Sequence, residues 1–107
     1  MKSITLAAFA LLCGASAARA QDASALITIQ NHKFSPSTIS VKAGVKVSLL
    51  VTNAGSEPAE FESAELNREK VIPPGKTVTI YVGPLAPGTY PFFDDFDQAN
   101  SGQIIAK

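Results

Sequence analysis

The chain has 107 residues, of which 46% are hydrophobic and 17% charged, and its nine basic and nine acidic residues balance to a net charge of zero at pH 7. No cluster of basic residues suggests a nucleic-acid partner, and the only long apolar run, residues 4–12, is too short for a permanent membrane anchor. A single cysteine, Cys13, excludes an intramolecular disulfide, so one compact hydrophobic core must stabilise one domain.

The first 20 residues have the pattern of a secretion signal. Lys2 supplies a positive start, residues 4–12 are apolar, and Ala18-Arg19-Ala20 is a small-x-small cleavage site. We therefore expect a cleaved signal peptide over residues 1–20, one folded domain over residues 21–107, and a periplasmic protein with no direct membrane insertion.

Cleavage after Ala20 changes the charge balance and the available donors. Lys2 and Arg19 are lost, so seven basic residues remain against nine acidic ones and the net charge becomes −2. Cys13 is lost as well. A competing interpretation places a lipoprotein cleavage site before Cys13, but Leu12 is a poor fit to the small residue expected there.

Short stretches that alternate apolar and polar residues follow, separated by turn-forming residues. In chain order, strands are expected over residues 25–30, 38–42, 45–53, 59–62, 76–82, 89–93 and 103–105. Only residues 63–70 have any helical character. Short strands at spacings of about 8–12 residues are typical of an antiparallel sandwich or barrel. We predict an all-β fold of seven or eight strands with at most one short helical turn.

The aromatic strand over residues 89–93 leads directly into an acidic stretch. Side chains two apart in a strand share a face, so Tyr90, Phe92 and Asp94 should point the same way. An ionised carboxylate at the end of a row of core aromatics must be hydrated, hydrogen-bonded, protonated or bound to a cation. Tyr90 is expected to fasten a loop corner through its hydroxyl.

Several motifs, in this order along the chain, resemble the cupredoxins. They are Phe34-Ser35-Pro36, Val41-Lys42-Ala43-Gly44, Val51-Thr52-Asn53, Pro87-Gly88-Thr89-Tyr90-Pro91-Phe92-Phe93, and Gly102 before the last strand. The resemblance covers nearly all of residues 21–107 and implies a Greek-key, cupredoxin-like β-sandwich or barrel. It aligns the histidine, cysteine, histidine and methionine copper ligands of that family with Ala59, Asp94, Asp97 and Asn100. Because a blue-copper centre needs a thiolate and imidazoles, we do not expect a blue-copper electron carrier.

A narrower resemblance involves the acidic segments. Residues 60–70, Gly83-Pro84-Leu85 and residues 92–96 are similar to the cupredoxin-like components of bacterial iron-uptake systems, namely the FtrB type and the N-terminal domain of EfeO. The resemblance implies a protein that handles iron or copper in the periplasm and works with an inner-membrane iron permease, a periplasmic iron-binding protein, or both. The proposed metal-binding elements of that family match Glu60, Glu62, Asp94 and Asp95.

Oxygen donors suit hard cations, so the expected metal ligands are Asp94, Asp97, Glu60 and Glu62, with His32 as a further candidate. Each has an alternative interpretation. Asp94 and Asp97 could accept backbone N–H bonds in a turn, the two glutamates could form the polar face of an edge strand, and His32 could be a surface-turn residue. Asp95 is expected to face away from Asp94, toward solvent.

Three functions are compatible with these residues. The first is a periplasmic protein that binds iron, or copper, for high-affinity iron uptake. The second is a metal-free docking module of the same transport system. The third is a ferroxidase, which would need oxygen or a redox partner, although no thiol or aromatic relay is visible in the sequence; enzymatic activity therefore stays open.

Overall fold

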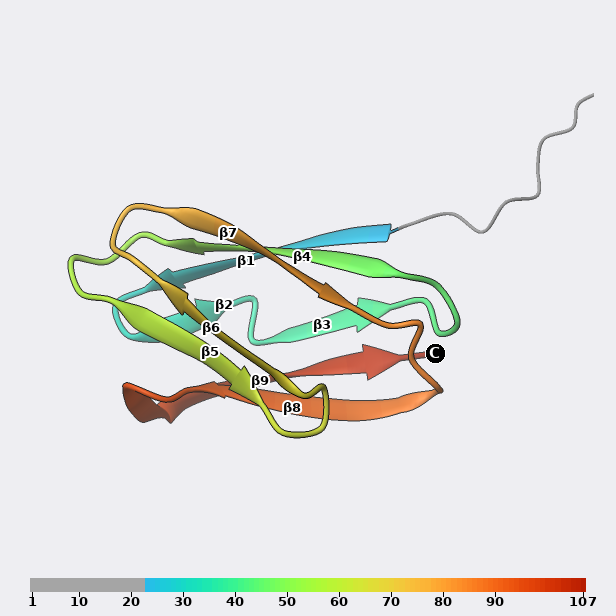
Figure 1. The fold of residues 1–107 in the computed structure, drawn as a ribbon. Coiled ribbons are helices and arrows are strands. Elements are labelled where there is room, and N and C mark those ends of the chain that lie inside the picture. The colour runs from blue at the N-terminus through green and yellow to red at the C-terminus, as the bar shows by residue number, and fades with distance from the viewer. Residues whose placement is uncertain (1–22) are drawn as a thin grey trace, which may run out of the picture.

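The computed structural model describes residues 23–107, so the predicted signal peptide, its cleavage site and Cys13 lie outside the described residues. This part of the chain contains nine strands and no helix, and so no helix that could cross a membrane. The strands are β1 (Ala23–Gln30), β2 (Lys33–Ser35), β3 (Thr38–Val41), β4 (Val47–Asn53), β5 (Ala59–Ser63), β6 (Arg68–Ile72), β7 (Thr77–Val82), β8 (Gly88–Asp94) and β9 (Asp97–Ala106) (Figure 1). The predicted all-β fold is confirmed, with one strand more than the upper expectation.

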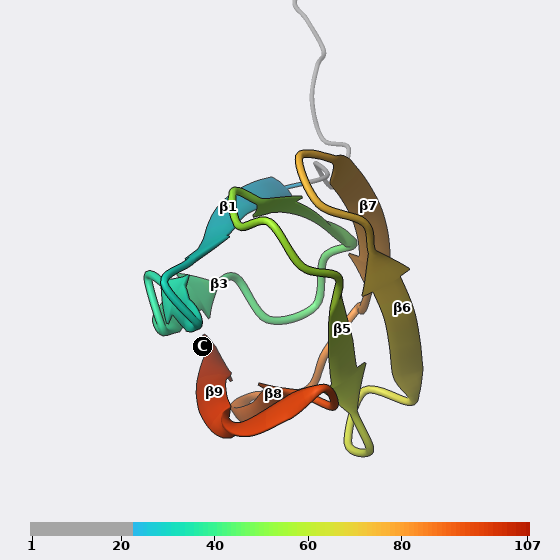
Figure 2. The same cartoon turned by 90° about the vertical axis from the view of Figure 1, so that its left-hand side faces the viewer.

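The strands form two sheets that face each other across the core (Figure 2). One sheet has the order β2-β1-β4-β7 and the other has the order β3-β9-β8-β5-β6. Most neighbouring strands are antiparallel, but β1 pairs with β4 and β3 pairs with β9 in parallel. The sandwich is therefore mixed, whereas the strand spacing in the sequence is typical of an antiparallel one.

The core follows from the alternation seen in the sequence. Buried apolar residues come from both sheets: Ile27, Ile29, Val47, Leu49, Val51, Phe61, Ile72, Ile80, Val82, Phe92 and Ile104, among others. At its centre, the ring of Phe92 stacks on Phe61 with centroids 4.8 Å apart and meets Phe34 edge-on at 4.9 Å. Contacts of this kind add to the hydrophobic stabilisation of the aromatic side chains. The Tyr90 hydroxyl donates to the Ala86 carbonyl at 2.7 Å, which confirms its predicted role at a loop corner.

The segment with predicted helical character is instead a turn followed by a strand. Residues 64–67 form the turn, with Asn67 at φ 57°, and β6 follows. β6 is an edge strand in which only Ile72 is buried. An exposed edge strand lacks the apolar alternation by which strands are recognised, so the sequence pattern could not reveal it.

The final loop is also shorter than expected. The return strand β9 begins at Asp97, so only Asp95 and Phe96 separate it from β8. The two strands pair over most of their length, with an irregularity in register at Phe93/Asp94. The first half of β9 is mostly exposed and polar, which explains why only its apolar end was predicted as a strand.

Candidate metal-binding site

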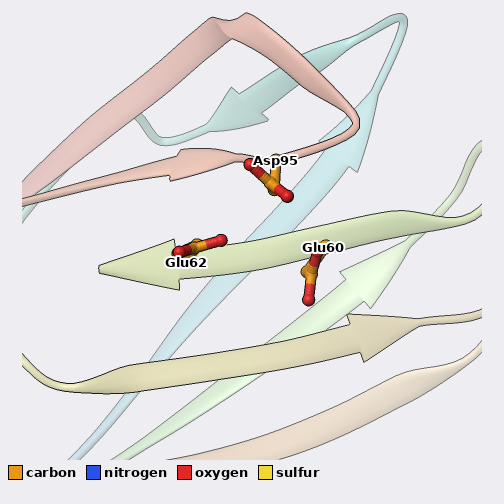
Figure 3. Close-up of side chains that lie close together, drawn as sticks. All are labelled: Glu60, Glu62 and Asp95. Atoms are coloured by element: carbon orange, nitrogen blue, oxygen red, sulfur yellow. The ribbon is translucent and has the colours of Figure 1, made fainter. Parts of the chain in front are cut away.

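Three carboxylates converge on the outer face of the five-stranded sheet. Glu60 and Glu62 project from β5 and Asp95 projects from the turn after β8, and each offers an oxygen within 4.8 Å of the others (Figure 3). These three residues are referred to below as the acidic cluster. Strand geometry explains why Glu60 and Glu62 share the outer face of β5, because the residues on either side of the inward-facing Phe61 must point outward.

Strand register brings Asp95 to the same place. Phe61 pairs with Asp94, and both side chains are buried. The residue after Asp94 therefore faces outward beside Glu60, and its backbone N–H donates to the Glu60 carbonyl at 2.9 Å. The expectation that Asp95 faces away from Asp94 was correct. The resemblance to iron-uptake components already groups Asp95 with Glu60 and Glu62, but strand parity alone does not show that the three side chains meet.

The electrostatics of the cluster disfavour its ionised state. Glu60 is only 9% exposed, and loss of hydration is the main cause of the raised pKa of its carboxyl group. A hydrogen bond with Glu69 and repulsion from Glu69, Asp95 and Glu62 raise this pKa further. The pKa of Glu62 is raised by desolvation and by the charges of Asp95 and Glu69. A bound cation would relieve this repulsion.

No basic side chain neutralises the cluster within residues 23–107. The only ion pair closer than 4.0 Å in that range joins His32 and Asp97, away from the cluster. On β6, the residue directly opposite Glu62 is another acid, Glu69. The cluster thus combines several hard oxygen donors with an uncompensated negative charge, a combination that suits a hard cation.

Asp94 lies beside the cluster but points to the interior. It is 4% exposed, and its Oδ1 accepts backbone N–H bonds from Glu60 at 2.9 Å and Phe96 at 3.0 Å. These are the contacts expected from the alternative interpretation, a loop carboxylate that satisfies backbone donors. A ligand role for Asp94 stays a prediction, and the structure does not place it among the converging oxygens.

Asp97 and His32 lie at the end of the sandwich, around a separate cavity of about 350 Å³. The cavity is lined by the β1–β2 turn, the β4–β5 loop and the β8–β9 turn, and Asp94 also reaches it. His32 is in a two-residue turn closed by the Gln30–Lys33 pair, and its Nδ1 lies 3.4 Å from Asp97 Oδ2. Their predicted ligand roles also stay predictions, since neither residue joins the acidic cluster.

Among the predicted ligands, the structure therefore brings together Glu60 and Glu62 and adds Asp95. It keeps Asp94, Asp97 and His32 apart from them. Parity predicts only that the residue after an inward-facing Asp94 points outward, and it does not say which outward residues of the neighbouring strand this residue meets. Register between β5 and β8 was the missing information.

Comparison with known proteins identifies the fold. The family described as a cupredoxin-like domain matches residues 3–106. An uncharacterized protein of Rickettsia prowazekii, RP394, is 43% identical over 79 residues, which cover 74% of this chain and 63% of that protein. The chain thus spans less than two thirds of the length of this relative.

Solved structures share the fold at low sequence identity. The metal-binding domain of the Streptococcus pneumoniae Cu(I)-exporting P-type ATPase CopA superimposes with a TM-score of 0.72 at 15% identity, over 78% of this chain and 84% of that one. A purple cupredoxin from Nitrosopumilus maritimus gives a TM-score of 0.61 at 18% identity, over 78% and 99% of the two chains. Amicyanin from Paracoccus versutus gives 0.61 at 14% identity, over 78% and 81%.

The side chains at the end of the sandwich do not fit a blue-copper ion. The sequence resemblance aligns the copper ligands of cupredoxins with Ala59, Asp94, Asp97 and Asn100. Residues 23–107 contain neither cysteine nor methionine. The Asn100 Oδ1 accepts a hydrogen bond from the Phe34 backbone N–H at 2.9 Å. Without a thiolate, this donor set lacks the ligand that defines blue-copper chemistry.

Proposed function

Since the chain belongs to the cupredoxin-like domain family, we propose that it is a periplasmic protein that carries a hard metal cation, iron in the first place, at the acidic cluster. The observation that supports this most is the convergence of Glu60, Glu62 and Asp95 oxygens within 4.8 Å. When these three carboxylates are ionised they repel one another, with no basic partner among residues 23–107, and a bound cation relieves that repulsion. Ferric and ferrous iron with oxygen ligands meet this requirement better than cuprous copper does.

Calorimetric titration tests the choice of metal. The purified protein is titrated with ferrous iron under anoxia, with ferric iron supplied as a weak chelate, and with cupric ion. We expect saturable binding of iron that is lost in Glu60→Gln, because this substitution removes one charge and one oxygen donor of the pair on β5. Glu57→Gln is the matched control, since Glu57 is exposed and outside the acidic cluster. Iron binding that is equal in both variants would contradict the assignment.

We further propose that the bound iron is cargo for import, delivered to an inner-membrane iron permease or to a periplasmic iron-binding partner. The proposal rests on the resemblance of residues 60–70 and 92–96 to components of iron-uptake systems. Radioactive iron uptake by cells that lack the gene should fall and should be restored by the wild-type chain but not by Glu60→Gln. Restoration by that variant, in a protein shown not to bind iron, would favour the metal-free docking function instead.

A further inference from the structure

We propose that Asp94 is a positioning residue for the acidic cluster and that it acts through backbone hydrogen bonds, without binding the metal itself. This inference rests on the proposed function, because it assigns a role relative to a cation held by Glu60, Glu62 and Asp95. The Asp94 carboxylate points into the core, whereas the other three lie on the outer face of the five-stranded sheet.

The first observation is the way in which Asp94 uses its carboxylate. One oxygen, Oδ1, accepts two N–H bonds, from Glu60 at 2.9 Å and from Phe96 at 3.0 Å. Glu60 starts the metal-binding part of β5, and Phe96 follows Asp95 in the turn. A single buried atom therefore connects the two segments that carry the cluster.

The second observation is the shortness of the ladder between β5 and β8. Their register covers only two pairs, Phe61 with Asp94 and Glu62 with Phe93. Beyond it, the Glu60 carbonyl accepts the Asp95 N–H at 2.9 Å, while the Glu60 N–H is bound by the Asp94 side chain. The carboxylate thus satisfies a backbone donor at the place where the regular ladder ends.

Together these contacts fix Glu60 relative to Asp95. Both backbone polar groups of Glu60 are held by residues 94 and 95, so the backbone of β5 and that of the β8–β9 turn cannot separate here without breaking at least one of these hydrogen bonds. Figure 3 shows Asp95 on the turn that runs beside β5, with its side chain extending toward the strand that carries the two glutamates. Residues that orient metal ligands in this indirect way typically change affinity about 10–100-fold when removed.

A pair of substitutions separates positioning from direct ligation. Asp94→Asn removes the charge but keeps an Oδ1 acceptor, whereas Asp94→Ala removes both. We expect Asp94→Ala to weaken binding of Mn²⁺, used as the probe cation, by about tenfold or more, and Asp94→Asn to stay within about threefold of the wild type. Glu62→Gln, which removes a cluster oxygen, should weaken binding like Asp94→Ala. Amide proton shifts of Glu60 and Phe96 should be kept in Asp94→Asn.

Each outcome decides one question. If Asp94→Asn weakens Mn²⁺ binding as strongly as Glu62→Gln, Asp94 contributes its charge directly and the positioning role is wrong. If Glu62→Gln loses binding while Asp94→Ala keeps it, the positioning role is wrong and the proposed function stands. If the wild type does not bind, or Glu62→Gln binds normally, the proposed function fails and this inference fails with it. Should Asp94→Ala not fold, Asp94→Asn alone still distinguishes a ligand from a positioning residue.

Discussion

In the metal-free protein, the surroundings of Glu60 and Glu62 disfavour the ionised form of their carboxyl groups. The pKa values of Glu60 and Glu62 are raised above their ordinary value of 4.5, so the folded state holds these protons more tightly than the unfolded chain does. Well below pH 4.5 the two carboxyl groups are protonated in both states, so their ionisation costs the folded state nothing. As pH rises through the raised pKa values, the folded state loses stability relative to the unfolded state.

The loss of stability with rising pH leads to a prediction for Glu62→Gln. The variant should raise the melting temperature of the metal-free protein at pH 7, because it removes a carboxylate whose ionisation is opposed by desolvation and by its neighbours. The gain should shrink toward zero at about pH 3.5, where the wild-type group is already protonated. Thermal melts with a chelator at both pH values measure it. Glu65→Gln, in the exposed turn before β6 and outside the acidic cluster, serves as the control.

A second residue-scale prediction concerns the buried Asn53. Its Nδ2 donates to the Glu57 carbonyl at 2.7 Å and the Ile72 carbonyl at 2.9 Å, and its Oδ1 accepts from Gly55 N–H at 2.9 Å. Asn53→Ala leaves these partners without bonds and should lower the free energy of unfolding by about 1–3 kcal/mol. Urea denaturation measures the loss.

The neighbouring Thr52 provides the control for that experiment. Its hydroxyl forms an exposed hydrogen bond with that of Thr77 on the neighbouring strand β7, so Thr52→Ala should cost about 0.5 kcal/mol or less. Equal losses in the two variants would show that the hydrogen bonds of Asn53 do not stabilise the β4–β5 loop.

At the scale of elements, the strands with clean alternation could be predicted and the others could not. β1, β4 and β7 each bury alternate apolar residues, and the sequence places them nearly correctly. β6 was missed because an edge strand buries too few residues to show a period. The polar start of β9 was missed for the same reason.

The candidate site was predicted only in part, and the reason is also at this scale. Alternation determines which residues face outward, so Glu60 and Glu62 could be paired from the sequence. Their meeting with Asp95 depends on the register between β5 and β8, two strands about 30 residues apart. Local patterns carry no information about register between distant strands, which is set by packing and turn geometry.

Gly102 on β9 tests the packing between elements. A Cβ at this position would overlap the Ser37 carbonyl oxygen and would lie 2.7 Å from the Phe92 ring, so there is no space for a side chain. Gly102→Ala should destabilise the protein by about 1–3 kcal/mol, the usual cost of adding atoms to a well-packed protein core. Gly55→Ala is a milder comparison, because its Cβ would meet only the Asn53 Oδ1, at 3.3 Å. A similar stability in both variants, measured by urea denaturation, would contradict the close packing of Gly102 against Ser37 and Phe92.

At the scale of the whole molecule, one strand joins the core to the candidate site. Phe61 is fully buried between Phe34 and Phe92, and it stands between the two glutamates of the cluster on β5. Phe61→Ala should lower the free energy of unfolding by about 3–5 kcal/mol. Phe96→Ala should change it by about 0.5 kcal/mol or less, since Phe96 is 55% exposed. Chemical denaturation of both variants compares them, and a small loss in Phe61→Ala would refute its central place in the core.

The proposal as a whole assigns the cation to the outer face of the five-stranded sheet instead of the end of the sandwich. The most direct measurement is Mn²⁺ binding followed by electron paramagnetic resonance, for wild type, Asp95→Asn and Asp97→Asn. The two variants remove the same charge two residues apart, one inside the acidic cluster and one beside His32. We predict that Asp95→Asn weakens binding about tenfold or more while Asp97→Asn changes it by less than about threefold. Loss of binding in Asp97→Asn together with normal binding in Asp95→Asn would contradict the proposal.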